Sequence, residues 1–237
     1  MMQFVIYVLG IMLFAEKSSM AEESPIPEPS SMITTQPIII EKWLPNEEVR
    51  QQLTDMYIRT HNTTYEDLAS TVFMEPKVVV LHWTAGSSMQ SAWNTFAPAT
   101  LSSRPDIKNG GELNVSAHFL VDVDGTIYQL LPLNRIARHC IGLNHIAIGI
   151  ENVGGVNKKP LTQAQIDANV QLVAWLVQEK QITHVIGHYQ LPNFQSHPYF
   201  SEKDPTYRTA KIDPGPEFVQ AVLQNLQEQG IAVRNID

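Results

Sequence analysis

This sequence has a single cysteine, no cluster of basic residues and no apolar run long enough to cross a bilayer. Cys140 is the one cysteine among 237 residues, so no disulfide within the chain supports the fold. Lys and Arg number 16 against 24 Asp and Glu, the net charge is −8, and the basic residues are scattered. Because nucleic acids and anionic surfaces are bound through basic patches, we expect no nucleic-acid partner and no charge-driven adhesion to membranes.

The longest apolar run, residues 4–15, has the length of the apolar core of a signal peptide and is too short to span a bilayer comfortably. Ser19 and Ala21 then supply the small residues of a cleavage site before Glu22. We therefore predict a signal peptide over residues 1–21, export to the periplasm or the medium, and no stable membrane span. Because no Lys or Arg precedes the run, an uncleaved N-terminal anchor is the alternative.

The rest of the chain divides into a linker and one domain. Residues 22–40 are rich in Pro, Ser and Glu with little apolar surface to bury, which predicts a solvated linker. Residues 41–232 combine strand-like and helix-like patterns without an internal repeat. This predicts a single α/β domain with a mixed central β-sheet flanked by helices. Strands are predicted at 77–81, 115–123, 126–131, 147–153 and 182–186.

Capping and turn residues mark the boundaries of several elements. Asn46, followed by acidic residues, predicts the start of a helix. Asp124-Gly125 separates two strand-like runs and is a strong hairpin signal. The apolar face of the first helix is predicted to comprise Val49, Leu53, Met56 and Tyr57. Further helices are predicted at 88–101, from Thr162 onward and after Pro216.

Two histidines and one aspartate form the strongest candidate metal site. His82 and His188 both stand where a strand-like run gives way to loop residues, which is where α/β sheets present ligands and catalytic groups. Asp213 lies in an Asp-Pro-Gly-Pro turn that fixes the direction of its carboxylate. Two imidazoles and a carboxylate, with a fourth position left for water, hold catalytic Zn²⁺, and such an ion lowers the pKa of a bound water to about 7.

Two other residues, His184 and Glu151, are not predicted to be metal ligands. His184 and His188 have the spacing of helical zinc motifs, but the residues between them predict a strand, in which four residues span roughly 13 Å. That is too far for one ion with bonds of about 2 Å, so we interpret His184 as structural. Glu151 ends the apolar run 148–150, and beside a metal it becomes the natural general base or acid.

Six short motifs occur in one order along residues 75–220. They are HWTAG at 82–86, SAHF at 116–119, DGTIYQ at 124–129, IGIE at 148–151, GH at 187–188 and KIDPG at 211–215. Each motif alone is weak, but the ordered set is specific. The sequence resembles the type 2 N-acetylmuramoyl-L-alanine amidases, relatives of the peptidoglycan recognition proteins and of phage T7 lysozyme.

The resemblance implies an enzyme that hydrolyses the amide bond between N-acetylmuramic acid and L-alanine in peptidoglycan or muropeptides. It implies one Zn²⁺ per chain, bound by His82, His188 and Asp213. Water on the metal would attack the amide, with Glu151 as general base and acid, while Lys211 and the ion would offset the oxyanion charge. Three further residues are expected on the substrate side of the site: His118, His139 and Asn144.

The sequence departs from the family pattern in two places. His188 and Asp213 are separated by 25 positions, whereas compact relatives have a much shorter connection. The inserted stretch 190–210 is expected to build a wall of the cleft. A separate metal site within this stretch is an open alternative, because it contains His197, Asp204, Tyr207 and Arg208. Ala117 stands where phage and animal relatives have a tyrosine. Bacterial members that use a catalytic glutamate also lack this tyrosine, which supports the catalytic role of Glu151.

Two other functions fit parts of the sequence. A non-catalytic peptidoglycan-binding recognition domain is one, although such domains typically lack a zinc ligand and this chain has all three. A cysteine hydrolase that pairs Cys140 with His139 or His145 is the other. Adjacent side chains on an extended chain point apart, so His139 is poorly placed to activate Cys140, which we expect to be a buried structural residue. The sequence leaves the preferred form of the substrate and the oligomeric state open.

Overall fold

The computed structural model describes residues 35–63, 72–155 and 159–236. The predicted signal peptide, residues 1–21, and most of the predicted linker therefore lie outside the described residues. None of the described helices combines the length and apolar character needed to cross a bilayer.

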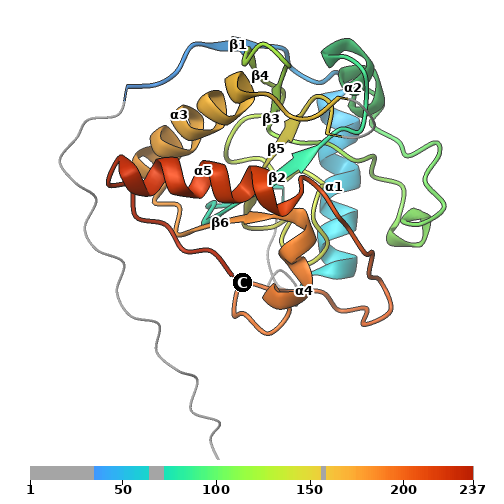
Figure 1. Cartoon of the computed structure of the whole chain (residues 1–237). Helices are drawn as coiled ribbons and strands as arrows, with labels where there is room; N and C mark the ends of the chain where they lie inside the picture. The colour runs from blue at the N-terminus through green and yellow to red at the C-terminus, as the bar shows by residue number, and fades with distance from the viewer. Residues whose placement is uncertain (1–34, 64–71, 156–158, 237) are drawn as a thin grey trace, which may run out of the picture.

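A six-stranded mixed sheet forms the centre of the domain, as predicted (Figure 1). Its strands follow the spatial order β1-β4-β3-β5-β2-β6. Only β3 and β4 pair antiparallel, and the other neighbours run parallel. The strands are β1 (Ile39–Glu41), β2 (Val78–Trp83), β3 (Phe119–Val121), β4 (Ile127–Gln129), β5 (Ala147–Asn152) and β6 (His184–Gly187). The sequence and the structure thus agree on the fold class, α/β with a mixed sheet.

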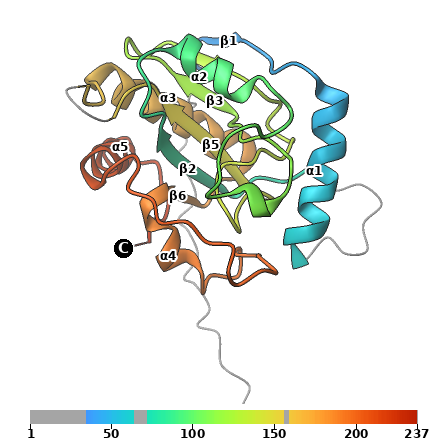
Figure 2. The same ribbon diagram turned by 90° about the vertical axis from the view of Figure 1, so that its right-hand side faces the viewer.

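Helices cover the sheet on both sides. In Figure 1, α3 and α5 run across the front of the sheet, and the perpendicular view places α1 on the opposite side of the molecule (Figure 2). The helices are α1 (Glu47–His61), α2 (Met89–Phe96), α3 (Gln163–Lys180), α4 (Leu191–Phe194) and α5 (Pro216–Glu228). Two short 3₁₀ helices, η2 (Lys108–Gly110) and η3 (His188–Gln190), lie in the connections. The helices shield the central parallel strands from water, as such strands require.

The alternation of side chains along β2 and β5 separates the core from the site. Leu81 and Ile150 belong to the main apolar cluster, which includes residues of α3 and α5. The adjacent residues His82 and Glu151 point to the other face, since successive side chains of a strand alternate. Val80, two positions before His82, packs in a second cluster on that face. The two central strands therefore provide both the core and a platform for chemistry.

Two local signals are confirmed in detail. Thr162 caps α3, and its hydroxyl accepts the backbone N–H of Gln165 while the Gln165 side chain accepts the N–H of Thr162. Asp124-Gly125 forms the turn between β3 and β4, with Gly125 at φ 85°. Both devices fix where an element begins, because each satisfies backbone groups that would otherwise be unpaired.

The predicted apolar face of α1 is right for Tyr57 and Leu53, which pack in or against the main core cluster, and wrong for Val49 and Met56. Val49 and Met56 are 46% and 63% exposed, while Arg50 and His61 are buried along with Tyr57. The reason is tertiary: α1 packs against polar loops, where the Arg50 guanidinium donates to the carbonyls of residues 96–98. Asn46 occupies the N-cap position, but its backbone is left-handed and its side chain makes no capping bond.

The domain is longer than predicted at both ends. Residues 39 and 40, which we predicted to be linker, pair with Ile127 and Tyr128 of β4. Near the C-terminus, Arg234 forms a β-bridge with His184 and lies beyond the predicted boundary at 232. In both places backbone pairing with a strand far away in the sequence orders a segment whose composition is unremarkable.

A pair of glycine substitutions tests the hairpin. Gly111→Ala adds a Cβ in open space at φ 94° and ψ 178°, a backbone region nearly restricted to glycine, and we expect a loss of stability of about 1–2 kcal/mol from backbone strain. Gly125→Ala has a similar φ, but its Cβ would lie 2.8 Å from the carbonyl oxygen of Ala164, so we expect roughly 2–3 kcal/mol. Urea unfolding of both variants measures the difference. Equal losses of stability in the two variants would show that the turn at residue 125 is not packed tightly against the start of α3.

Candidate metal and catalytic site

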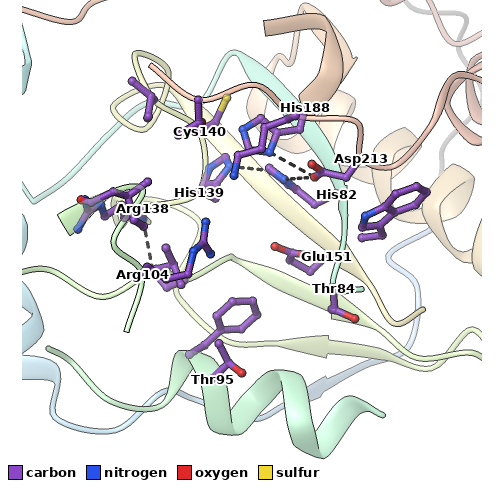
Figure 3. A pocket seen from close by; sticks show the side chains of 18 of the residues that line it. His82, Thr84, Thr95, Arg104, Arg138, His139, Cys140, Glu151, His188 and Asp213 are labelled. Carbon is purple, nitrogen blue, oxygen red and sulfur yellow. Dashed lines mark hydrogen bonds and ion pairs between the residues drawn. The ribbon is translucent and has the colours of Figure 1, made fainter. Parts of the chain in front are cut away.

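Three side chains predicted as metal ligands converge at one end of the sheet. Asp213 Oδ2 lies 3.1 Å from Nδ1 of His82 and 3.2 Å from Nδ1 of His188. Their candidate ligand atoms all fall within 4.8 Å of one another, and all three residues are buried. Figure 3 shows the two imidazoles and the carboxylate pointing toward one another. Within the described parts of the chain, no other group of three His, Cys, Asp or Glu residues has this arrangement.

The spacing and chemistry of these donors fit a zinc ion. Two ligand atoms bound about 2.0–2.1 Å from a tetrahedral ion are roughly 3.3 Å apart, close to the separations between Asp213 and the two histidines. The same distances also fit hydrogen bonds from neutral imidazoles to the carboxylate. The donor set is nevertheless the two-nitrogen, one-oxygen set of catalytic zinc sites, so the residues present fit the metal.

Sheet register and one loop contact bring the residues together. His82 is the direct partner of Glu151 across β2 and β5, so both side chains leave the same face. Leu81 is paired with Gly187, which places His188 beside the end of β2. The long connection to Asp213 is closed by a 2.9 Å bond from the Tyr189 N–H to the Asp213 carbonyl.

Electrostatic interactions and burial keep the Asp213 carboxylate charged and the His188 imidazole neutral. Burial by itself would raise the pKa of Asp213, but hydrogen bonds from His188 and His82 outweigh it and hold that pKa well below the usual range. Burial, with a smaller contribution from His82, lowers the pKa of His188 to about 4, while Asp213 opposes the change. A neutral imidazole and an ionised carboxylate are the forms that bind a metal.

Glu151 faces the same cavity in an environment that favours its protonated form. Burial raises the pKa of Glu151 to about 7, with His82 and Lys211 opposing the rise and Asp213 adding to it. Its Oε2 is buried and has no hydrogen-bond partner among the described residues. A carboxyl group that titrates near neutral pH can both accept and release a proton, as a general base and acid must.

A cavity of about 310 Å³ contains this cluster. Lys211 lines it, as the motif mapping implies, beside Trp83 and Thr84 of the first motif. Arg104 and Arg138 also lie in its wall, and sequence reasoning missed both because no motif includes them. Arg104 forms a two-pronged ion pair with Asp106 at 2.9 and 2.7 Å.

The three predicted substrate-side residues have different surroundings. His139 and Asn144 line the cavity, but the Asn144 carbonyl oxygen accepts the backbone N–H groups of His139 and Cys140. The prediction that His118 lies on the substrate side is wrong, because His118 has no exposed surface and does not line the cavity. Its Nε2 bonds to the carbonyl of Arg135 and its Nδ1 accepts the N–H of Gly149, so neither nitrogen is available to a substrate.

The inserted stretch 190–210 builds part of the cavity wall, as expected, through Tyr207 and Thr209. Arg138 donates to the Tyr207 hydroxyl at 2.7 Å and holds this wall to the loop before β3. His197 packs edge-on against His184 with ring centroids 4.9 Å apart, outside the metal cluster. A separate metal site in the insert therefore has no support among the described residues, and His184 is structural, as predicted.

Cys140 is buried, as expected from the sequence. Burial raises the pKa of its thiol far above the ordinary value. Because the thiolate is the nucleophilic form, this environment disfavours cysteine catalysis.

Comparison with known proteins identifies the family of this chain. A family model described as N-acetylmuramoyl-L-alanine amidase matches residues 72–216, more than half of the chain. This chain belongs to the N-acetylmuramoyl-L-alanine amidase family. The matched range contains every residue of the amidase motifs.

Among curated proteins, peptidoglycan recognition protein 3 of Mus musculus is 29% identical over 50% of this chain and 35% of its own length. The Homo sapiens protein of the same name is 30% identical over 50% of this chain and 36% of its own length. The chain thus matches about a third of each mammalian relative. The solved complex of the E. coli amidase AmiD with anhydro-N-acetylmuramic acid-L-Ala-D-γ-Glu-L-Lys is 25% identical, with TM-score 0.47, over 69% of this chain and 61% of that one.

The raised pKa of Glu151 gives a stability prediction for the metal-free amidase domain. The folded state favours protonated Glu151, so this stabilisation is complete below the ordinary carboxyl pKa and is lost as the pH rises through about 7. We expect Glu151→Gln to stabilise the metal-free protein at pH 8 by about 2–3 kcal/mol and to change little at pH 4. Urea unfolding at the two pH values measures this, with the exposed Glu112→Gln as control. A gain that is equal at both pH values would contradict the burial argument.

Proposed function

We propose that this protein is a zinc-dependent N-acetylmuramoyl-L-alanine amidase that binds one Zn²⁺ per chain through His82, His188 and Asp213. Membership of the amidase family supports the reaction. The spacing and protonation of the three side chains support the metal. The bond to be hydrolysed joins N-acetylmuramic acid to L-alanine in peptidoglycan or muropeptides.

The observation that carries the proposal is the placement of Glu151 beside a complete ligand set. It is the sheet partner of His82 and lines the same cavity as all three ligands. A domain that only binds peptidoglycan needs no proton-transfer group at this position. The combination of a buried carboxyl group with a pKa near 7 and an intact donor set therefore favours hydrolysis over recognition alone.

When bound, zinc would act as a Lewis acid toward the amide and lower the pKa of water. Glu151 would take a proton from the attacking water and pass it to the departing nitrogen of L-alanine. Lys211 lines the same cavity and would offset negative charge on the carbonyl oxygen. His82 and His188 are 2% and 5% exposed, and this burial would hold their rings in place for the metal.

The proposal also includes export of the protein from the cytoplasm. The apolar run at residues 4–15 and the small residues Ser19 and Ala21 support export to the periplasm or the medium. Peptidoglycan lies in that compartment, so an exported amidase would meet its substrate directly.

Mass spectrometry of peptidoglycan and muropeptides digested by the protein tests the activity. We expect free stem peptides that begin with L-alanine, and no such products after treatment with a chelator. A thiol alkylator should leave the activity intact, since the Cys140 thiol is buried. Loss of activity to the alkylator and not to the chelator would overturn the zinc mechanism.

Two variants separate metal binding from proton transfer. His82→Ala is expected to lose both zinc and activity. Glu151→Ala is expected to keep zinc, measured by atomic absorption, while its turnover falls by at least about 10²-fold. Normal turnover by Glu151→Ala would show that another group moves the proton. Muropeptide binding without hydrolysis by the unmodified, zinc-loaded protein would instead indicate a recognition domain.

A further inference from the structure

His139 contacts a candidate metal ligand directly, although the amidase motifs do not include it. Its Nδ1 lies 3.0 Å from Nε2 of His82, and the two rings meet edge to face at 88°. Its Nε2 lies 3.1 Å from the carbonyl oxygen of Ala147 at the start of β5. Both ring nitrogens of His139 are thus engaged within the protein, so neither is available to contact a substrate.

These partners assign the position of each proton. The carbonyl of Ala147 can only accept a hydrogen bond, so Nε2 of His139 carries the proton. Nδ1 of a neutral His139 is then an acceptor, and Nε2–H of His82 must donate to it. A neutral His82 that binds a metal through Nδ1 carries its one ring proton on Nε2, so the 3.0 Å contact requires Nδ1 of His139 to accept that proton. A bound metal would take the place of the proton that Nδ1 of His82 shares with Asp213 in the metal-free protein.

We infer that His139 is a positioning residue that fixes the tautomer and the ring orientation of His82, so that the Nδ1 lone pair of His82 is presented to the metal. The inference rests on the proposed metal centre. It replaces the expectation that His139 contacts substrate. A metal-bound histidine commonly donates its other N–H to an acceptor of the protein, and loss of such a partner weakens metal binding.

The surrounding residues hold His139 in this position. Asn144 accepts the backbone N–H groups of His139 and Cys140, both at 2.8 Å, and donates to the Tyr57 hydroxyl at 3.1 Å. This links the His139 loop to helix α1. Gly149 leaves space for the ring, because a Cβ at that position would lie 2.8–3.0 Å from ring atoms of His139. The glycine of the IGIE motif is therefore required for close approach of the imidazole.

Metal affinity of two His139 variants tests the inference. His139→Leu removes the acceptor, and we expect zinc binding to weaken by roughly 10–100-fold. In His139→Asn the side-chain oxygen can occupy the position of Nδ1, so we expect affinity within a few-fold of the unmodified protein. Competition with a chromogenic chelator measures zinc affinity, and the absorption spectrum of the Co²⁺-loaded protein reports the ligand geometry.

Further variants control for a general structural effect. His145→Leu alters a partly buried histidine of the same loop that does not line the cavity, and it should leave zinc affinity unchanged. Gly149→Ala should displace the His139 ring and weaken zinc binding as His139→Leu does. The melting temperature of each metal-free variant shows whether it is folded. Nitrogen-15 NMR of the histidine rings in the zinc-loaded protein should show protons on Nε2 of both His82 and His139.

Two different results would contradict the role of His139 and the proposed metal centre. If His139→Leu binds zinc as tightly as the unmodified protein, or if His139→Asn loses as much affinity as His139→Leu, His139 does not position the ligand. If the unmodified protein binds no zinc, the proposed metal centre itself is wrong. These two failures are distinguishable, because the first appears only in the variants and the second in the protein without substitutions.

Discussion

The parallel pairing of β2 with β5 on one side and β6 on the other is the constraint on which the site depends. This register places His82 directly beside Glu151 and brings Gly187 next to Leu81, so that His188 follows at the same edge. A shift of one residue in either pairing would turn the functional side chains to the apolar face. The core residues on that face, such as Ile150, therefore also secure the geometry of the site, because burying them fixes the register.

Polar side chains inside the domain hold the segments around the cavity. Arg138 donates to backbone carbonyls of the loop before β3 and to the hydroxyl of Tyr207 in the insert. His61 of α1 pairs with Glu202 of the same insert at 2.9 Å, and both side chains are nearly inaccessible to solvent. A buried polar group that loses its partner costs free energy, so these contacts favour one position for the insert.

The histidines illustrate how one residue type takes several roles in a single domain. His82 and His188 converge on Asp213, whereas His118 is bonded to backbone groups on both ring nitrogens. His139 lies between these roles, since it contacts the ligand His82 and not the other two members of the donor set. Hydrogen-bond partners, and not proximity to the cavity alone, separate the candidate ligands from their supports.

Much of the fold could be predicted because it depends on local signals. The Thr162 cap, the Asp124-Gly125 turn and the β-branched run of β2 each specify an element through nearby residues, and motif order pointed to the residues His82, His188 and Asp213. The buried face of α1 and the pairing of β1 could not be predicted in this way, since both depend on partners far away in the sequence. The roles of His118 and His139 escaped prediction for the same reason. A histidine looks alike in every sequence, and only the groups that tertiary structure places around its two nitrogens decide what it can bind.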